Sequence, residues 1–216
     1  MLGVICLLED MVSKAAVVLA GGMGTRMTSR IPKVLHKVCG REMLGLVVDS
    51  TKSAGFDDVV VVVRPESVAI RNLLGESVRY AVQSEPLGTG HALLSARELL
   101  DGVDDVLVIN GDVPLIRHET IESVVRTHAE GDVCATLLTS ELERPNGMGR
   151  VVRDESGNVY GVVEEVECDE HTRSITEVNV GVYAFRTSWL WSNMDTISPN
   201  QDGEIYLTEV VSIASI

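Results

Sequence analysis

The apolar residues of this chain gather in short continuous runs that amphipathic segments separate. Residues 15–19, 59–63 and 106–109 form three such runs, each rich in β-branched side chains, and each predicts a strand. Because these runs are apolar at every position, both faces of the strands should be buried. This pattern is typical of a parallel sheet that helices cover on both sides.

Apolar residues at helical spacing fill the intervals between the runs. We expect helices over residues 43–54, 67–74 and 91–100, and the first ends at Gly55, a natural C-terminal stop. Strands that alternate with helices imply right-handed crossovers between parallel strands. The sequence therefore predicts an α/β protein with a doubly wound, Rossmann-like fold, in which helices cover both faces of a mainly parallel central sheet.

Beyond residue 133 the predicted segments become shorter. A strand over 133–139 precedes two alternating strands, 150–153 and 158–164, which flank the turn Asp154-Glu155-Ser156-Gly157 and so predict a small hairpin subregion. The remaining expected elements are a strand over 181–185, a helix near 188–194 and a helical stretch over 206–214.

The length of the chain suits one domain. A protein of 216 residues buries roughly 70% of the surface that its unfolded form exposes. No Gly cap, polar tail or further strand follows the last helical stretch. We therefore expect a single domain, residues 1–216, that is truncated at its C-terminus or is an unusually short version.

The charge balance restricts the possible partners. The chain has 18 basic and 32 acidic residues and a formal net charge of −14, which argues against non-specific binding to nucleic acid or to an anionic membrane. A polyphosphate ligand would have to be held by a local concentration of cations, with Mg²⁺ as its companion.

The cysteines and the apolar segments indicate the compartment. Cys6, Cys39, Cys134 and Cys168 form no Cys-x-x-Cys pair, so we expect reduced, mostly buried thiols and no metal cluster. Residues 1–8 are apolar but lack a basic leader, which makes a poor signal peptide. No apolar run approaches the ~20 residues of a membrane span, so we predict a cytoplasmic protein.

The first predicted strand runs into a glycine-rich loop, Leu19-Ala20-Gly21-Gly22-Met23-Gly24-Thr25-Arg26-Met27. Its glycines permit positive φ and a close approach of ligand to the backbone, so successive N–H groups can bind an anion. Arg26 and Lys33 add positive charge beside it, and a guanidinium can grip phosphate oxygens bidentately. We predict that this loop binds polyphosphate; an ordinary strand-to-helix turn is the alternative.

Two further loops should meet this one, because ligands of open α/β sheets bind outside the carboxyl ends of the strands. In residues 83–91, glycines would let the backbone approach a base or ribose, and Gln83 could pair with an amide edge. In residues 110–115, Asp112 follows a buried strand, and Gly111 leaves room for a hydrated cation. Asp112 is our predicted Mg²⁺ ligand, with a helix N-cap as the alternative.

Competing motifs fail on particular residues. A dinucleotide fingerprint that begins at Gly22 has Met27 where a third glycine is needed, and Lys33 follows a proline rather than the glycine of a Walker A loop. No Asp or Ser is spaced to form a triad with His36 or His91. We expect the other histidines on the solvated surface: His118, His128 and His171.

Taken together, these motifs resemble those of sugar-1-phosphate nucleotidyltransferases and, more narrowly, of N-acetylglucosamine-1-phosphate uridyltransferases. The similarity rests on six motifs in that family's order, which makes it far more specific than any single loop. They are Pro32-Lys33-Val34-Leu35-His36, Leu87-Gly88-Thr89-Gly90-His91-Ala92, Gly111-Asp112-Val113-Pro114-Leu115-Ile116, Gly149-Arg150, Glu177-Val178-Asn179-Val180-Gly181 and Glu204-Ile205-Tyr206-Leu207-Thr208-Glu209.

The resemblance implies a domain that joins UTP to N-acetylglucosamine 1-phosphate, releasing pyrophosphate and UDP-N-acetylglucosamine for peptidoglycan synthesis in the cell wall. Carried over by position, Arg26 and Lys33 would hold the phosphates, and Asp112 would bind Mg²⁺. The amino sugar, under the hairpin, would contact Thr89, Gly149, Glu164 and Asn179. The nucleotide would be lined by Leu19, Ala20, Gly21, Gly22, Gly24, Thr25, Gln83, Gly88 and Thr89.

Some positions depart from the family's pattern. Gly21 stands where a second alanine is usual, Asn110 where an aromatic residue often precedes Gly-Asp, and Val180 where a threonine is usual. The family's second metal ligand and its β-helix acetyltransferase domain would lie beyond Ile216. Two alternatives therefore stay open: a related enzyme for a different sugar or base, and a catalytically weak nucleotide-binding homologue.

Overall fold

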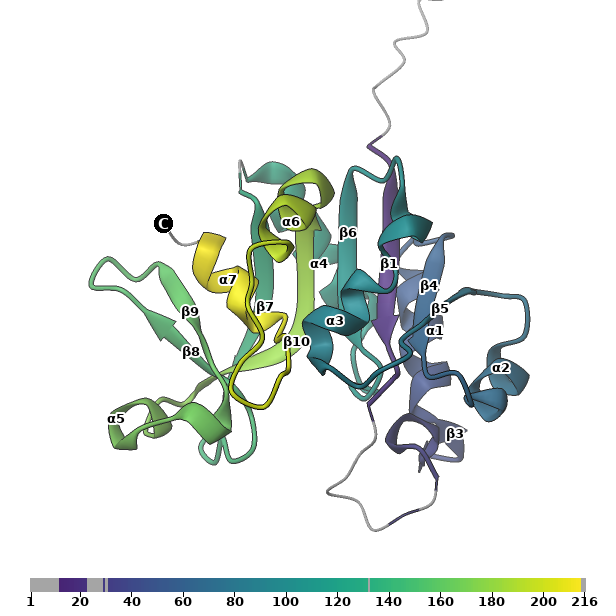
Figure 1. Cartoon of the computed structure of the whole chain (residues 1–216), viewed down its shortest axis with the longest axis horizontal. Helices are drawn as coiled ribbons and strands as arrows, with labels where there is room; N and C mark the ends of the chain where they lie inside the picture. Colours follow the sequence, from purple (N-terminus) through teal and green to yellow (C-terminus); the bar gives the residue numbers. More distant parts are fainter. Residues whose placement is uncertain (1–11, 23–28, 30, 132, 215–216) are drawn as a thin grey trace, which may run out of the picture.

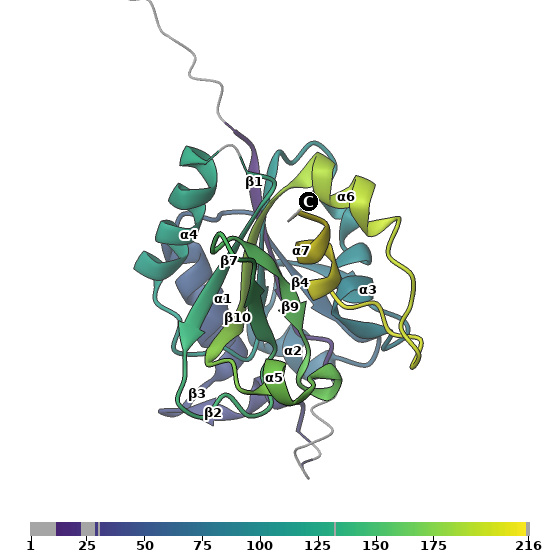
Figure 2. The ribbon, with the colours of Figure 1, turned by 90° about the vertical axis from the view of Figure 1, so that its left-hand side faces the viewer.

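A mixed sheet forms the centre of the molecule. The computed structural model describes residues 12–22, 29, 31–131 and 133–214 (Figure 1). In these ranges a sheet of eight strands separates two layers of helices, which Figure 2 shows from the side. The strands follow the order β5-β4-β1-β6-β10-β8-β9, and β7 pairs with β10 outside this path. This architecture confirms the predicted α/β class and its Rossmann-like layers.

The parallel half of the sheet contains the three apolar runs and one strand that the sequence analysis missed. The first strand, β1 (Lys14–Leu19), pairs in parallel with both β4 (Val59–Val63) and β6 (Asp105–Asn110). At the edge, β5 (Arg79–Val82) pairs in parallel with β4. Only Ala81 of β5 is buried, so this edge strand lacks the continuous apolar run that marks the other three.

The alternation of side chains along β1 produces two hydrophobic cores. Ala15, Val17 and Leu19 face one core, whereas Ala16 and Val18 face the other. The first core takes buried side chains from α3 (Gly88–Leu94), α6 (Thr187–Met194) and α7 (Thr208–Ala214), and the second from α1 (Met43–Ser53), α2 (Val68–Leu74) and α4 (His118–Glu130).

Two helical segments differ from the prediction. The helix expected over residues 91–100 is wrong in its bounds, because α3 ends at Leu94 and a separate 3-10 turn, η2 (Arg97–Leu100), follows. The Ser95 hydroxyl donates to the carbonyl of His91 at 3.0 Å, a bond that often bends helices. The sequence analysis missed α4 because most of its residues are polar or charged.

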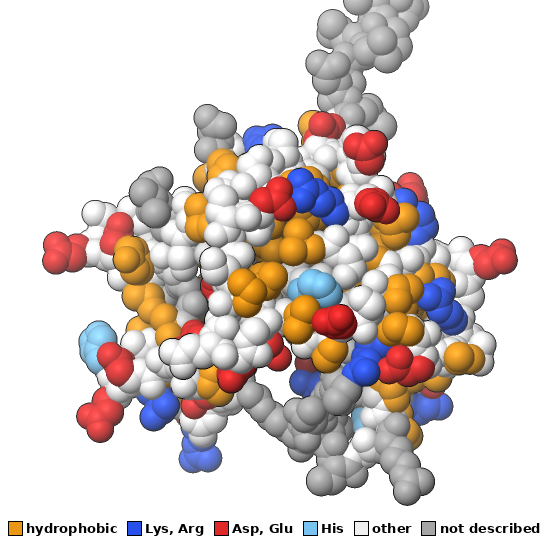
Figure 3. Space-filling view, in the orientation of Figure 1, with side chains coloured by type: hydrophobic (Ala, Val, Ile, Leu, Met, Phe, Trp, Pro, Cys, Tyr) orange, Lys and Arg blue, Asp and Glu red, His pale blue; other side chains and the backbone are white. Residues whose placement is uncertain are grey.

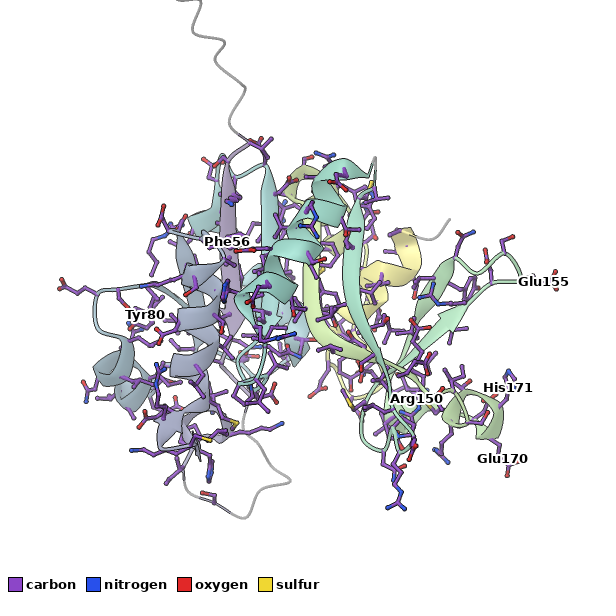
Figure 4. The ribbon with its side chains drawn as sticks, turned by 180° about the vertical axis from the view of Figure 1, so that it is seen from behind. Phe56, Tyr80, Arg150, Glu155, Glu170 and His171 are labelled. Carbon is purple, nitrogen blue, oxygen red and sulfur yellow. The ribbon has the colours of Figure 1, made fainter. Side chains whose placement is uncertain are left out.

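The second half of the sheet is antiparallel. The long strand β10 (Glu177–Arg186) pairs antiparallel with β6, β7 (Ala135–Glu141) and β8 (Arg150–Arg153). Only residues 181–185 of β10 were predicted, since polar side chains interrupt the apolar pattern before them. The predicted hairpin is confirmed: β8 pairs with β9 (Val159–Val163), and Glu155 projects outward at its tip (Figure 4).

Short elements complete the described chain. Glu170 and His171 project away from the body of the molecule (Figure 4), which agrees with the predicted surface position of His171. None of the helices in the described ranges combines the length and apolar character that a membrane span requires. The short elements are η1 (Lys33–Leu35), β2 (Lys37–Val38), β3 (Arg41–Glu42), η3 (Glu165–Glu167) and α5 (Glu170–Arg173).

The predicted surface position of His128 is wrong. Its side chain is only 2% exposed, because it lies on the same face of α4 as Ile121 and Val124. Its Nδ1 lies 3.1 Å from Thr136 Oγ1, and its Nε2 lies 3.7 Å from Asp105 Oδ1. Burial lowers the pKa of His128, although the negative charge of Asp105 acts in the opposite direction and raises it.

The cysteines agree only in part with the prediction. Cys39, Cys134 and Cys168 are free thiols, as expected, but only Cys168 is buried. Cys39 is exposed at a positive φ of 51°, in the tight connection between β2 and β3. Burial raises the pKa of the Cys168 thiol. Cys6 lies outside the described residues.

Candidate functional site

The predicted nucleotide loop begins at the carboxyl end of β1, at the lower edge of the sheet in Figure 1. Leu19, Ala20 and Gly21 are buried there, and Gly22 is exposed. The amide of Gly111 donates to the carbonyl of Leu19 at 2.9 Å, which joins the loop after β6 to the end of β1. Three residues that were predicted from this loop lie outside the described residues: Gly24, Thr25 and Arg26.

Lys33 and Asp112 meet at this edge. Lys33 comes from η1 and Asp112 from the loop that follows β6, and the Lys33 ammonium donates to Asp112 Oδ2. The Lys33 side chain is 46% exposed and the Asp112 side chain is 28% exposed, so both are accessible to a ligand. A Cβ on Gly111 would lie 3.0 Å from the carbonyl oxygen of Leu19, which explains why glycine precedes Asp112. The structure thus brings together two of the three predicted catalytic residues.

Gln83 is buried in the predicted base-binding region and contacts two other residues of that region. Its side chain is 5% exposed, and its Nε2 donates to the carbonyl of Gly88 at 3.0 Å and lies 3.2 Å from His91 Nδ1. A Cβ on Gly21 would come within 2.8 Å of Gln83 Oε1, so a glycine is required where the two meet. The Gln83 amide was expected to pair with a base, but its NH₂ group already has protein partners in this structure.

The segment before α7 connects this region to the hairpin. The Thr89 hydroxyl accepts from the amide of Leu207 at 3.0 Å, and the amide of Gly90 donates to the carbonyl of Ile205 at 2.8 Å. Gly88 has a φ of +93°, and a Cβ there would lie 2.4 Å from the Ile205 carbonyl oxygen. The glycines of this motif are therefore required by the backbone of the 205–207 segment, which packs directly against them.

Three of the predicted sugar-binding residues, Gly149, Glu164 and Asn179, lie together at the base of the hairpin. The amide of Asn179 donates to the carbonyl of Gly149 at 2.9 Å. A Cβ on Gly149 would lie 3.5 Å from Glu164 Oε2, so the backbone at Gly149 packs close to this carboxylate. The hydroxyl of Thr208, at the start of α7, donates to Glu164 Oε1 at 3.1 Å.

A buried tyrosine supports Asn179. Asn179 Nδ2 donates to the Tyr183 hydroxyl at 2.6 Å, and Asn179 Oδ1 accepts from the amide of Gly181 at 3.0 Å. The Tyr183 side chain is 3% exposed. Its pKa is raised strongly by burial and further by the charge of Glu164, although the bond from Asn179 lowers it.

Arg150 anchors the loop that carries Gly149. Its side chain is fully buried at the foot of the hairpin (Figure 4), and its guanidinium donates to the carbonyl of Met148. Its Nη2 lies 2.8 Å from Glu165 Oε2, which also accepts from the amide of Gly147 at 3.2 Å. The hydrogen bond from Arg150 lowers the pKa of Glu165.

Asn110 lies between the Lys33–Asp112 pair and the residues that are predicted to bind the sugar. It precedes Asp112 by two positions, and a Cβ on Gly181 would lie 2.1 Å from Asn110 Nδ2. Gly181 itself has a φ of +81° and follows Asn179 by two positions. The end of β6 and the bend in β10 are therefore in direct contact. This contact places the Lys33–Asp112 pair and the Asn179 group along the same edge of the sheet.

The sequence analysis missed three supporting residues: Tyr183, Thr208 and Glu165. Thr208 could have been found from the sequence, since it lies inside the quoted Glu204–Glu209 motif. In the structure its neighbour Leu207 contacts Thr89. No sequence pattern marks Tyr183 or Glu165, because their roles arise from contacts across the bend in β10 and from the buried Arg150.

Two cavities of the described chain lie away from these residues. One of about 760 Å³ is lined by residues that include Arg97, Thr187 and Trp191, and one of about 180 Å³ by residues that include Phe56 and His128. Neither includes a predicted site residue. Basic and acidic side chains are interspersed on the face that carries α3, α6 and α7 (Figure 3), so a phosphate ligand would depend on local groups such as Lys33.

A search of protein families adds a match over most of the chain. The family model described as the MobA-like NTP transferase domain matches residues 16–178. This range includes most of β1, the Lys33–Asp112 pair and three of the predicted sugar-binding residues, Thr89, Gly149 and Glu164, and it ends one residue before Asn179.

Curated proteins match over nearly the full chain. The Bifunctional protein GlmU of Clostridium novyi is 41% identical over 203 residues, which are 93% of this chain and 44% of that protein. The Bifunctional protein GlmU of Halalkalibacterium halodurans is 43% identical over 205 residues, 94% of this chain and 45% of that protein. The chain thus spans less than half the length of these relatives.

Solved structures share the fold. A Bacillus anthracis protein described as a glucose-1-phosphate thymidylyltransferase, in complex with sucrose, superimposes with a TM-score of 0.78 at 21% identity, over 92% of this chain and 81% of that one. A UDP-glucose pyrophosphorylase complexed with UDP-glucose gives a TM-score of 0.74 at 18% identity, over 95% and 87%. At these identities the likeness concerns the fold alone.

Proposed function

The chain belongs to the family of MobA-like NTP transferase domains, and we propose that it joins a nucleoside triphosphate to a sugar 1-phosphate with release of pyrophosphate. Its substrates would be UTP and N-acetylglucosamine 1-phosphate, as the sequence resemblance implies. The shared sheet and its two cores support assigning the described residues to one nucleotidyltransferase domain. We place the protein in the cytoplasm, and its net charge of −14 argues against a nucleic acid partner.

The observation that carries this proposal is the convergence of two groups of side chains at one edge of the sheet. Lys33 and Asp112 supply opposite charges there, as a polyphosphate and its cation require. Glu164 and Asn179 supply polar groups of the kind that hold sugar hydroxyls and amides, and Thr208 and Tyr183 already fix their orientation. Arg26 would join Lys33 on the phosphates.

The donor set fits a hard divalent cation, and we assign Mg²⁺ to it. The described residues contain no cluster of three or more His, Cys, Asp or Glu that could hold a metal. A single accessible carboxylate, Asp112, suits Mg²⁺ because this ion keeps several waters and takes further oxygens from phosphate. When bound, the cation would neutralise charge on the triphosphate. Asp112 would hold it, and Lys33 would then face the phosphates.

The proposed reaction needs no nucleophilic side chain. A sugar phosphate is largely dianionic near pH 7, because its second pKa lies near 6, so its own oxygen can attack the α-phosphorus of UTP. The pyrophosphate leaves along the opposite direction and carries away the electron pair of the broken bond. Lys33 and Arg26 would stabilise the charge that develops on it.

Pyrophosphate release tests the proposal. The protein, incubated with Mg²⁺, UTP and N-acetylglucosamine 1-phosphate, should release pyrophosphate, and Asp112→Asn should lower kcat by about 10²–10³-fold. Asp202→Asn, at an exposed position of the loop before α7, is the matched control and should keep wild-type activity. A panel of other bases and sugars decides specificity. An absence of turnover with every pair in the panel would contradict the proposal.

A further inference from the structure

Tyr183 is a buried polar group beside the proposed sugar site, and the proposed reaction does not use it. Its side chain lies in β10 and is 3% exposed, and its ring stacks on Phe185 with centroids 5.7 Å apart. A buried phenol needs a hydrogen-bond partner, and Tyr183 finds one in the side chain of Asn179, four residues earlier in the same strand.

A bend in β10 makes this contact possible. Four residues of a regular strand span about 13 Å, so side chains at positions i and i+4 do not ordinarily meet. The register of β10 against β7 shifts between Asn179 and Tyr183, and Gly181 in the middle has a φ of +81°. Such a bulge bends the strand and re-aims its side chains. Asn179 and Tyr183 come to 2.6 Å as a result.

The hydrogen bonds determine which way the Asn179 carboxamide points. The amide of Gly181 can only donate, so the atom that faces it at 3.0 Å must be the oxygen, Oδ1. The NH₂ group of Asn179 must then face the Tyr183 hydroxyl, which accepts one of its two hydrogens. Among the described residues, the Tyr183 hydroxyl is the one partner of this NH₂ group, so its second N–H can meet a ligand. Asn179 is half-buried, so a ligand can reach it.

We propose that Tyr183 is a positioning residue for the sugar half of the site, which orients the Asn179 carboxamide so that its second N–H faces the sugar phosphate. This inference rests on the proposed function. Tyr183 touches no reacting atom. Its hydroxyl accepts a hydrogen bond from the amide and so holds it from behind.

Removal of the Tyr183 hydroxyl tests the proposal. In the full chain, Tyr183→Phe leaves one N–H of Asn179 without a partner and frees the carboxamide to rotate. The KM for the sugar phosphate should rise about five- to tenfold, whereas the KM for UTP stays unchanged and kcat stays within twofold. Tyr160→Phe is the matched control, because Tyr160 is a β9 phenol that is 64% exposed, and it should leave both KM values unchanged.

A merely structural role gives a different result. Loss of packing would lower the free energy of unfolding and raise both KM values together, and this outcome would overturn the proposal, as would an unchanged KM for the sugar phosphate. In an Asn179→Ala background, Tyr183→Phe should add nothing further, because the group that it positions is gone. An equal effect of Tyr183→Phe in both backgrounds also contradicts the proposal.

A readout without turnover separates this inference from the proposed function. The side-chain NH₂ resonances of Asn179, observed by NMR in the free protein, should shift in Tyr183→Phe and not in Tyr160→Phe. Unshifted resonances in Tyr183→Phe overturn the inference, whatever the activity. An inactive wild-type protein overturns the proposed function, and the same resonances with and without added sugar phosphate then decide whether Asn179 still meets this ligand.

Discussion

Lys33 and Asp112, which lie 79 residues apart in the sequence, form an ion pair at the carboxyl edge of the parallel strands. In the proposed reaction these two side chains hold ligands of opposite charge, the phosphates and the cation. The free protein therefore keeps the proposed phosphate-binding cation and the proposed metal ligand in contact with each other, and in the proposed reaction substrate binding would separate them.

Removal of the Lys33 charge should therefore strengthen cation binding in the absence of nucleotide. In Lys33→Met, Asp112 loses its competitor, and the affinity for Mn²⁺, titrated by electron paramagnetic resonance, should rise by up to about fivefold, since exposed ion pairs contribute ~0.2–1 kcal/mol. Lys37→Met is the control, because Lys37 is also exposed but pairs with Glu42. Unchanged or weaker Mn²⁺ binding by Lys33→Met would show that the pair does not compete with the cation.

A side chain at Gly88 should lower the free energy of unfolding more than a side chain at Gly102, a glycine with a similar φ that has open space around it. At Gly88, φ is +93° and a Cβ would lie 2.4 Å from the Ile205 carbonyl oxygen, whereas at Gly102, φ is +77° and nothing lies within 4 Å. Gly102→Ala should cost about 1–2 kcal/mol of backbone strain. Gly88→Ala should cost about 1–3 kcal/mol more, because the backbone must shift. Urea unfolding of both variants checks this, and equal free energies of unfolding would contradict the clash.

Loss of the Thr208 hydroxyl should weaken sugar binding. Thr208 donates to Glu164 Oε1 at 3.1 Å and is 4% exposed, so Thr208→Val leaves the carboxylate with a looser orientation. A hydrogen bond to a charged group contributes about 1.5–3 kcal/mol, so the KM for the sugar phosphate should rise at least tenfold. Thr208→Ser keeps the hydroxyl and should stay close to wild type. If both variants raise this KM equally, packing rather than the hydrogen bond is responsible.

His128 should make the protein less stable in mildly acidic solution. Because burial lowers its pKa below 6.5 in the folded state, the unfolded chain binds the proton first. The contribution of neutral His128 to the free energy of unfolding is therefore complete above about pH 6.5, the pKa of histidine in the unfolded chain. It is lost as the pH falls towards the lowered pKa of the folded state. Thermal unfolding of wild type between pH 7.5 and 5.5 should show this loss.

A variant without the titrating group is the control for this effect. His128→Gln should flatten the dependence of Tm on pH in the same interval. The carboxylates with lowered pKa, such as Glu165 and Glu177, act in a separate interval, because they lose their contribution only below about 4.5. An equally steep pH dependence in His128→Gln would show that His128, which faces Asp105 and Arg186, is not the group responsible.

The parallel half of the fold was readable from the sequence because its strands are buried on both faces. Residues 59–63 are five consecutive valines, and all five are buried in β4. Where one face meets solvent or a polar site, as in β5 and at the start of β10, the pattern weakens and the prediction missed the element or its beginning. His128 was misplaced for a related reason, since a helical position only becomes buried once the partner sheet is known.

For the candidate site, too, some features were predicted from the sequence and others were visible only in the structure. Residue type and placement predicted Lys33 and Asp112 as groups that would touch ligands, because ligand chemistry limits which side chains can serve. Glu164 and Asn179 were predicted only through the family resemblance. The sequence could not show that Lys33 and Asp112 neutralise each other, or that Tyr183 and Thr208 hold the sugar-binding side chains from behind. Those contacts join positions far apart in the chain or across a bulge.

The sequence by itself determined the layered α/β architecture and suggested the phosphate-binding chemistry proposed for the glycine loop, because burial pattern and residue type are local properties of the chain. Tertiary structure alone decided how the parallel strands end against the antiparallel β10, and how the bend at Gly181 sets Asn179 against Tyr183. Such contacts depend on the relative placement of β6, β10 and α7, since hydrogen bonds act only over a few ångströms.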